Sequence, residues 1–448
     1  MVMTIHKLTA GDGYTYLTRQ VAGGDVTREP GQDGTGYYTA NGNPPGMWIG
    51  RGAPLLGLAG QQVTEEQMRA LFGHGQHPDG EAMIEAHLTA SVRPGMSASE
   101  LARSRREAIR AAALGRPFPS YEPLEKFGVR VGRRLAIITE ETGRDPTQAE
   151  IKKVHREEAR RQRAAVAGFD AVFAPVKSAV LLWALDERPR VRDAVRQAHE
   201  DAKNAALGLL EDHAAFTRTG TGGIAQIRTR GLIAAAFDHY DSRDGDPNLH
   251  THVAISSKVQ GVDGKWRALD ARALYRITVA ASECFNTAFE TALTQRLGVQ
   301  FVPRPDTRGN TEPVREISGV PFGMIGHFSA RRASIEARYT DLVRTYRREH
   351  GHDPSRAACH QLARQANLDT RQAKKPARSL DQMRAAWRAS LAAAFGPKAV
   401  RQLMAAVPGP AEAAAGVTAG RAVLGREQIQ AAAERAVANV ATKRSTWT

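Results

Sequence analysis

The sequence predicts an α+β protein in which a central antiparallel sheet is surrounded by helices and carries basic helical arms. The middle third of the chain shows strand-like patterns in three consecutive stretches, at 222–240, 249–260 and 264–270, which glycine and aspartate turns separate. The segments on both sides of it have helical periodicity and an excess of lysine and arginine. We therefore expect a nearly neutral sheet between two basic helical regions.

The remaining elements follow from local patterns. Helical stretches are recognised by their 3.6-residue period, and strands by alternation or by short apolar runs between turn residues. The expected elements are a strand at Thr4–Leu8, a basic helical segment at 75–165, a strand at 168–175, helices from near Lys177 and over 191–214, and a helix from about Ala271 to Gln295.

The charge of the chain predicts a polyanionic partner. The 448 residues include 62 lysines and arginines against 47 acidic residues, which gives a net charge of +15. Residues 101–165 hold 16 lysines and arginines against 9 acidic residues, and residues 331–380 hold 12 against 5. Almost all of the positive surplus therefore lies in these two segments. Nucleic acid fits such a distribution best, and an acidic membrane surface is the weaker alternative.

Cysteine usage and hydropathy indicate a cytoplasmic protein without membrane insertion. Only Cys284 and Cys359 occur, and neither belongs to a CxxC pair, so any metal ligands should be histidines or carboxylates. The N-terminus lacks the pattern of a signal peptide, and no stretch of 18 apolar residues is present. No GxxxxGK[ST] loop occurs either, so we expect no helicase motor.

Two segments resemble each other within the chain. Residues 140–154 and 348–362 both pair a helix with a Gly-x-Asp-Pro-[Ser/Thr]-x-Ala turn and a second helix. Thr147 and Glu150 have the spacing of a capping box, which suits a helix that restarts after the turn. The two copies are interpreted either as helix-turn-helix-like units that present basic residues to DNA or as ordinary helical hairpins.

Three histidines lie in the stretch "FDHYDSRDGDPNLHTHVAI" (237–255). In a strand, His250 and His252 point to the same face because they are two residues apart. If 231–239 form the partner strand, the hairpin brings His239 to the same place. Three imidazoles with open positions are typical of a catalytic metal site, although hydrogen-bonded or surface histidines are the alternative. Imidazole favours zinc, manganese, nickel or copper over magnesium.

Tyrosines near the N-terminus are candidates for a nucleophile. Four of the nine tyrosines fall in the first 40 residues, and each pair follows a glycine turn: Tyr14, Tyr16, Tyr37 and Tyr38. A phenol needs a base or a cation before it attacks well at neutral pH. Asp170 alternates with apolar residues in "GFDAVFAPVKS", which places its carboxylate where it could face the histidines as a base or as an orienting group.

Four features in this order resemble the MobF (TrwC/TraI-like) conjugative relaxases of the HUH endonuclease superfamily. They are the N-terminal tyrosines, "FDAVFAPVKS", "FDHYDSRDGDPNLHTHVAI" and "GKWRALDARALY". The resemblance implies a relaxase palm whose metal ligands are His239, His250 and His252. It also implies that Asp170 helps to activate a tyrosine.

The resemblance leaves the nucleophile open. Family members usually show two Tyr-Tyr pairs, whereas the first pair here is Tyr14-Thr15-Tyr16. We expect Tyr14 first and Tyr16 next, with Tyr37 or Tyr38 serving a later transfer or lining the site. The reaction implied is strand-specific nicking at an origin of transfer through a 5′-phosphotyrosyl intermediate, followed by rejoining.

The resemblance also implies the domains and partners. Residues 1–330 are expected to form the catalytic domain, with a basic helical insertion at about 75–165, and 331–448 a helical C-terminal region. A divalent ion is implied, Mg²⁺ or Mn²⁺ by resemblance, with Zn²⁺, Ni²⁺ or Co²⁺ compatible with three histidines. Expected partners are single-stranded DNA at a transfer origin, an accessory DNA-binding protein and a coupling protein.

Two alternatives remain open from the sequence. A rolling-circle replication initiator or a transposase would use the same chemistry at another DNA site. A basic single-stranded-DNA-binding accessory protein would bind DNA without cutting it, although all three histidines and Asp170 are present.

Overall fold

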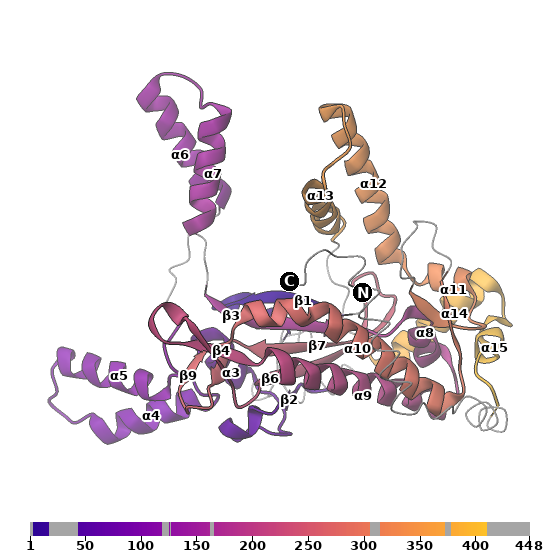
Figure 1. The fold of residues 1–448 in the computed structure, drawn as a ribbon, viewed down its shortest axis with the longest axis horizontal. Helices are drawn as coiled ribbons and strands as arrows, with labels where there is room; N and C mark the ends of the chain where they lie inside the picture. Colours follow the sequence, from indigo (N-terminus) through magenta and orange to yellow (C-terminus); the bar gives the residue numbers. More distant parts are fainter. Residues whose placement is uncertain are drawn as a thin grey trace.

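The computed structural model describes residues 3–17, 44–118, 125, 127–161, 165–304, 314–371 and 378–409. Its centre is a five-stranded sheet of strand order β1-β3-β7-β6-β2, in which every pair of neighbours is antiparallel (Figure 1). The strands are β1 (Met3–Thr9), β2 (Met47–Ile49), β3 (Val166–Phe173), β6 (Ala234–Asp241) and β7 (Pro247–Ser256). The predicted α+β class is confirmed.

Three two-stranded ribbons accompany the central sheet, and each is antiparallel. Three of their six strands fall within the predicted stretches 222–240, 249–260 and 264–270. The ribbons pair β4 (Phe216–Thr219) with β5 (Ala225–Arg228), β8 (Lys258–Gln260) with β9 (Trp266–Ala268), and β10 (Phe301–Pro303) with β11 (Arg315–Ile317); a single 3₁₀ turn, η4 (Thr221–Gly223), joins β4 to β5.

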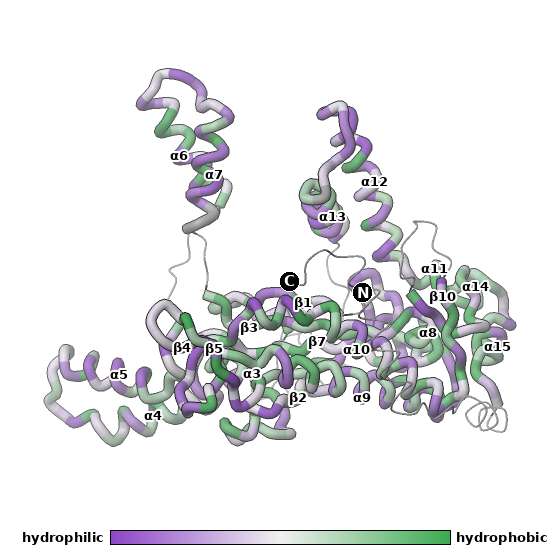
Figure 2. Tube along the Cα trace, viewed as in Figure 1, coloured by the Kyte–Doolittle hydropathy of each residue, from purple (hydrophilic) through white to green (hydrophobic). Residues whose placement is uncertain are grey.

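One face of the central sheet, here called the reverse face, is covered by long helices. Because strand side chains alternate, Phe169, Ala171 and Phe173 of β3 point to this face together and join the larger apolar cluster. The ring of Phe173 lies 5.5 Å from that of Phe285 on the longest helix. The apolar bands of Figure 2 follow these packed segments. The helices are α8 (Lys177–Leu185), α9 (Pro189–Ala214) and α10 (Ala271–Leu297).

The opposite face, here called the front face, is covered at one end by short helical segments. Leu8, Phe237 and Ala254 contribute to a second apolar cluster there. Gly168 allows this cover to approach, because a Cβ at that position would lie 2.3 Å from the Ile255 carbonyl oxygen and 2.8 Å from the ring of Phe72. The covering segments are η1 (Asp12–Tyr14), η2 (Ala53–Leu56), α3 (Glu65–Met68) and the π-helical η3 (Arg69–His74).

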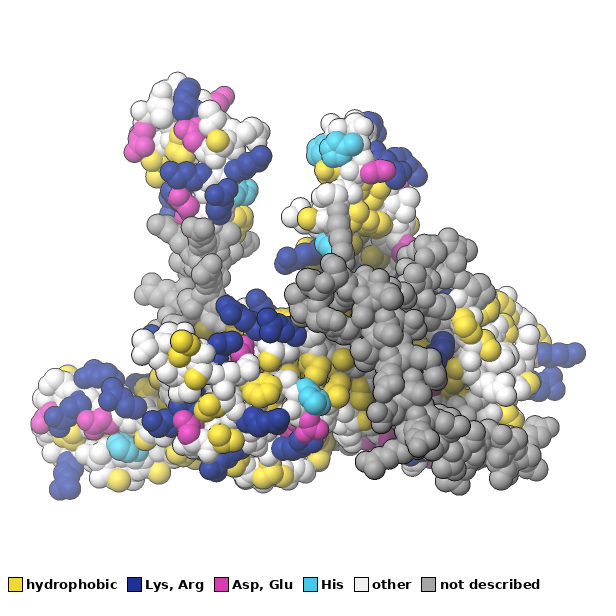
Figure 3. Space-filling view, viewed as in Figure 1, with side chains coloured by type: hydrophobic (Ala, Val, Ile, Leu, Met, Phe, Trp, Pro, Cys, Tyr) yellow, Lys and Arg dark blue, Asp and Glu magenta, His cyan; other side chains and the backbone are white. Residues whose placement is uncertain are grey.

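Three helical hairpins project from this body. In Figure 1, two of them rise from the same side of the sheet, and the third extends from one end. Lysine and arginine side chains gather over all three in Figure 3. The rising pairs are α6 (Phe127–Thr142) with α7 (Gln148–Arg161) and α12 (Ala330–His350) with α13 (Arg356–Asp369), and the end pair is α4 (Gly80–Ser91) with α5 (Ala98–Ala112).

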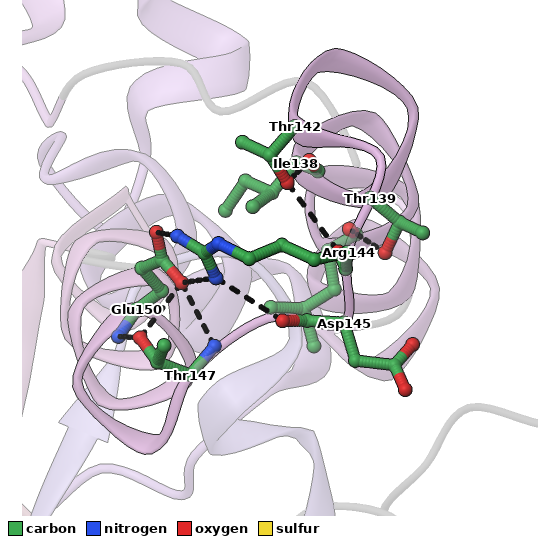
Figure 4. Close-up of polar contacts among 8 residues, drawn as sticks. Ile138, Thr139, Thr142, Arg144, Asp145, Thr147 and Glu150 are labelled. Atoms are coloured by element: carbon green, nitrogen blue, oxygen red, sulfur yellow. Dashed lines mark hydrogen bonds and ion pairs between the residues drawn. The ribbon is translucent and has the colours of Figure 1, made fainter.

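The two internally similar segments form the two rising hairpins. At the α6–α7 turn the backbone N–H of Thr147 donates to Glu150 at 2.8 Å, and the Glu150 N–H donates to the Thr147 hydroxyl at 3.4 Å. Arg144 donates to both carboxylate oxygens of Glu150 (Figure 4). The capping box predicted from the sequence is confirmed.

The C-terminal helices pack against the reverse-face core. Met383, Trp387 and Leu391 from one of them are buried in the same cluster as α8. The division of the chain at residue 330 stays a prediction. Among the described residues, no helix is both long and apolar enough to span a bilayer. These helices are α11 (Phe322–His327), α14 (Leu380–Phe395) and α15 (Ala399–Met404).

Truncation of the reverse-face core should destabilise the sheet. Phe285 has no exposed surface, so Phe285→Ala should lower the free energy of unfolding by about 3–5 kcal/mol. Phe322 is 44% exposed, and Phe322→Ala should cost less than about 1 kcal/mol. Urea unfolding followed by tryptophan fluorescence compares the two variants, and equal losses would contradict this assignment of the core.

Candidate metal centre and active site

The β6–β7 hairpin brings the three predicted histidines together. Its register pairs His239 directly with His250, and Phe237 with His252, so all three imidazoles lie on the front face. One ligand atom from each lies within 4.8 Å of the other two. Among the residues that the structure describes, no other group of three potential ligands is so placed.

Hydrogen bonds orient two of the imidazoles. Nδ1 of His250 lies 2.6 Å from the Asn248 carbonyl oxygen, and Nδ1 of His252 lies 2.8 Å from Oδ2 of Asp170. Both partners only accept, so Nδ1 of each ring carries a proton and donates it. Burial, and secondarily the charge of His252, lowers the pKa of His250 to about 3, so this ring is neutral at physiological pH.

The donor set fits one transition-metal ion. Neutral imidazoles oriented through Nδ1–H bonds to carboxylate or carbonyl oxygens are the usual arrangement of protein metal ligands. Nitrogens about 2.1 Å from a shared ion are about 3–3.5 Å apart, so small side-chain movements bring the three histidines to binding distance. Three protein ligands leave coordination positions for substrate oxygens.

A tyrosine joins the centre through Asp170. Asp170 is 2% exposed and lies on β3, two residues before the one that pairs with His252. The Tyr16 hydroxyl donates to Oδ2 of Asp170, the same oxygen that accepts from His252. The Tyr16 ring stands edge-on to that of His252, 6.0 Å away. The hydroxyl, the carboxylate and the imidazoles thus form one contiguous group.

The other predicted tyrosines are placed differently. Tyr14 is 5% exposed and packs 6.3 Å from Phe72 in the front-face cluster. Its hydroxyl lies against η3, since a Cβ on Gly73 would be 3.5 Å from it. Tyr37 and Tyr38 lie outside the described residues. The structure therefore brings Tyr16, Asp170 and the three histidines together, and it packs Tyr14 against Phe72 and η3.

The turn of the histidine hairpin is held by two other parts of the chain. The Ala330 N–H at the start of α12 donates to Asp246 at 2.9 Å, and the indole N–H of Trp387 donates to the Gly245 carbonyl at 2.7 Å. One basic hairpin thus begins at the turn that follows β6. A pocket of about 610 Å³ opens here beside the start of α12, and its lining includes Val172, Lys177, Asn248, Arg331 and Arg332.

Three arginines gather beside the same turn. Burial lowers the pKa of Arg243, and so do the positive charges of Arg371 and Arg331. Arg331 donates to the Thr370 and Asn367 carbonyl oxygens, so these bonds leave its charge uncompensated. An anion would relieve the repulsion among the three arginines, beside Asp244 and Asp246 of the same turn.

Some functional neighbours were missed by the sequence analysis. The backbone carbonyl of Asn248 orients His250, and a pattern of side chains in the sequence cannot predict such a backbone contact. Tyr14 and Tyr16 follow the same glycine turn in the sequence. The path of the backbone through η1 decides which of them reaches Asp170. Strand alternation along "FDHYD" and "LHTHV" puts Asp238 and Thr251 on the face opposite the histidines. That these two residues pair directly could be known only from the register.

The fold and the site define a class of protein in which one face of an antiparallel sheet presents three histidines and a carboxylate beside a tyrosine from a neighbouring helical turn. Comparison with known proteins gives the family. A family model described as TrwC relaxase matches residues 10–394, so the chain belongs to the TrwC relaxase family.

Two curated relatives are conjugation proteins. The multifunctional conjugation protein TraI of Escherichia coli is 28% identical over 203 residues, which are 42% of this chain and 11% of that protein. TraI of Escherichia coli strain K12 is 33% identical over 105 residues, or 23% of this chain and 6% of that protein. The matched part of the chain is a small fraction of these relatives' length.

Solved structures of TrwC have the same fold. A copper-bound structure of the conjugative relaxase TrwC with OriT DNA covers 88% of this chain and 98% of its own, with a TM-score of 0.51 and 21% identity. TrwC with a 27-mer DNA that comprises the recognition hairpin and the cleavage site has the same coverage, a TM-score of 0.50 and 20% identity. At such identities the likeness supports the fold.

Loss of one imidazole should abolish tight metal binding. His250→Ala should weaken the affinity for Co²⁺ by more than about 100-fold, and Asp170→Asn, which alters the partner of His252, by about 10–100-fold. His213 is exposed at the end of α9, and His213→Ala should bind as the unsubstituted chain does. Calorimetric titration checks this, and equal affinities in all four proteins would contradict the site.

Proposed function

We propose that this chain is a conjugative relaxase that nicks one DNA strand at an origin of transfer. The observation that carries the proposal is the shared carboxylate: Asp170 accepts hydrogen bonds from both the Tyr16 hydroxyl and His252. A nucleophile, its proton acceptor and a metal ligand are thereby adjacent on one face of the sheet. Membership of the TrwC relaxase family supports the same activity.

The chemistry is a transesterification with Tyr16 as nucleophile. A divalent ion held by His239, His250 and His252 would polarise the scissile phosphodiester and offset its negative charge. The Tyr16 oxygen attacks phosphorus while its proton passes to Asp170. A bond forms between phosphorus and the tyrosine oxygen, and the bond to the 3′-oxygen breaks. The 3′-oxygen takes up a proton, from Asp170 or from water, and leaves as a hydroxyl. The 5′-phosphate stays on the protein until the reverse attack rejoins the strand.

The choice of Tyr16 over Tyr14 rests on position. Burial and the neighbouring Asp170 carboxylate both raise the pKa of Tyr16 above its ordinary value. A proton acceptor within hydrogen-bond reach therefore matters more here than for a solvated phenol. Tyr14 packs against Phe72 instead. For Tyr37 and Tyr38 we keep the proposal that one of them serves a second strand transfer.

The metal identity follows from the donor set only in part. Mg²⁺ prefers oxygen ligands, whereas imidazole suits the later divalent transition metals. We propose Mn²⁺ or Mg²⁺ as the physiological ion on the family resemblance, with Zn²⁺, Ni²⁺ and Co²⁺ as ions that the three histidines would also accept.

The proposed substrate is single-stranded DNA at a transfer origin. The TrwC structures with OriT DNA support it, and so does the basic surface of the rising hairpins (Figure 3). The arginines at the foot of α12 would contact phosphates next to the metal centre, which positions a strand without reading its sequence. Action in the cytoplasm, with an accessory DNA-binding protein and a coupling protein, completes the proposal.

Two other functions would use the same surface. A rolling-circle initiator or transposase would act at a replication origin or a transposon end, and the family match favours a transfer origin instead. An accessory protein would bind single-stranded DNA and leave it intact. Covalent capture of DNA separates this last function from the other two.

Covalent capture should depend on Tyr16. The protein is incubated with Mn²⁺ and a pool of single-stranded oligonucleotides with a randomised core, and adducts are resolved on denaturing gels. Tyr16→Phe should reduce adduct formation by at least about 100-fold, because the nucleophilic oxygen is lost.

Tyr14→Phe is the matched control. It removes a hydroxyl two residues away and should leave the adduct within about threefold of the unsubstituted yield. Loss of the adduct in Tyr14→Phe, with retention in Tyr16→Phe, would return the nucleophile to Tyr14. DNA binding without any adduct, in Mn²⁺ and again in Mg²⁺, would favour the accessory protein.

The arginine cluster should contribute one phosphate contact. Arg243→Gln should weaken binding to single-stranded oligonucleotides of unrelated sequence to a similar degree. It should also reduce the slope of log affinity against log salt by about 0.7. Arg190 is exposed on α9, across the sheet from the histidines, and Arg190→Gln should change neither quantity. Fluorescence anisotropy across a salt series measures both, and an unchanged slope for Arg243→Gln would contradict the contact.

A further inference from the structure

A buried polar chain lies on the reverse face, directly behind the histidines. Thr251 stands between His250 and His252 on β7, and alternation turns its side chain to the reverse face. The sheet register pairs it with Asp238, the residue before His239 on β6. Each of these two polar residues is thus adjacent in sequence to a proposed metal ligand.

Hydrogen bonds connect the two strands to a helix at this point. The Thr251 hydroxyl donates to Oδ1 of Asp238, and it lies 2.7 Å from Nε2 of His199 on α9. Since the hydroxyl proton goes to Asp238, the Thr251 oxygen accepts from His199. Thr251 is 0% exposed and His199 is 2% exposed. We call Asp238, Thr251 and His199 the reverse-face network.

The position of His199 is fixed from its other side. Its ring stands edge-on to Phe285 of α10, 5.6 Å away, and Phe285 packs against Phe173 of β3. The network therefore ties the histidine hairpin to the buried aromatic residues of the reverse-face core. The metal chemistry on the front face makes no use of these three residues.

The ladder loses its regularity next to the network. The pairing of β6 with β7 is regular up to His239 and His250, and the register then shifts before Asp241 reaches Pro247. Proline cannot donate a ladder hydrogen bond. The metal ligands thus lie in the last regular residue pairs of the β6–β7 ladder. Backbone hydrogen bonds specify the register least there, because the regular pairing ends beside them. A slip of one residue there would turn His250 and His252 to the reverse face.

We propose that the reverse-face network positions the three metal ligands by fixing the β6–β7 register from behind. Asp238, Thr251 and His199 lie on the face opposite the proposed metal site and act through the histidines, so they are positioning residues. The inference rests on the proposed metal site and deepens it, because it names what holds the ligands at binding distance.

The test compares two isosteric substitutions of buried threonines. Thr251→Val removes the hydroxyl of the network. Thr217→Val, on β4, removes a hydroxyl that is equally buried and donates to the Ala268 carbonyl at 2.7 Å. Co²⁺ affinity is measured by titration of the absorption bands of the bound ion, and urea unfolding of the metal-free proteins gives their stability. Thr251→Val should weaken Co²⁺ binding about tenfold or more, and Thr217→Val less than twofold.

Two further variants sharpen the result. Thr251→Ser keeps the hydroxyl and should restore the affinity to within about twofold, which loss of packing alone would not explain. Asp238→Ala should weaken Co²⁺ binding as Thr251→Val does, and it decides the matter if the valine variant does not fold.

The outcomes distinguish this inference from the proposed function. Unchanged Co²⁺ affinity in folded Thr251→Val or Asp238→Ala would overturn the positioning role and leave the metal site intact. Absence of saturable Co²⁺ binding in the unsubstituted chain would overturn the metal site itself and the inference with it.

Discussion

The antiparallel register between β6 and β7 is the constraint on which the site depends. It places His239 opposite His250 and leaves His252 one side-chain repeat away on the same face. The sequence position of one histidine alone does not identify it as a metal ligand. The three histidines form a donor set only through this pairing. Apolar packing on both faces of the sheet holds the pairing in place, through the long helices behind and the short segments in front.

Asp170 joins the metal centre to the chemistry. It lies on the neighbouring strand, accepts from His252 and from the Tyr16 hydroxyl, and is almost entirely buried. A buried carboxylate with two donors is stable where it is and costly to leave without them. The Asp170 carboxylate therefore orients the imidazole of His252 and also holds the Tyr16 hydroxyl beside it. In this way a tyrosine from the first 20 residues meets a hairpin more than 200 residues later in the chain.

Much of this could be predicted from the sequence. Strand alternation gave the shared face of His250 and His252, and the partner strand followed from the apolar run before His239. The order of Tyr14 and Tyr16 could not be settled, because it depends on how η1 packs against Phe72. His199 was also out of reach, since a buried histidine 52 residues from Thr251 leaves no local pattern. Tertiary contacts of this kind decide roles that spacing leaves open.

Mass-spectrometric localisation of a nucleotide remnant tests the central claim most directly. Trypsin should release residues 8–19 as one peptide, which contains both Tyr14 and Tyr16, so fragmentation within that peptide is needed after nuclease digestion of the captured DNA. The geometry predicts the phosphonucleotide mass on Tyr16. Its presence on Tyr14, Tyr37 or Tyr38 in the first-formed adduct would contradict the assembly of Tyr16, Asp170 and the histidines as the active site.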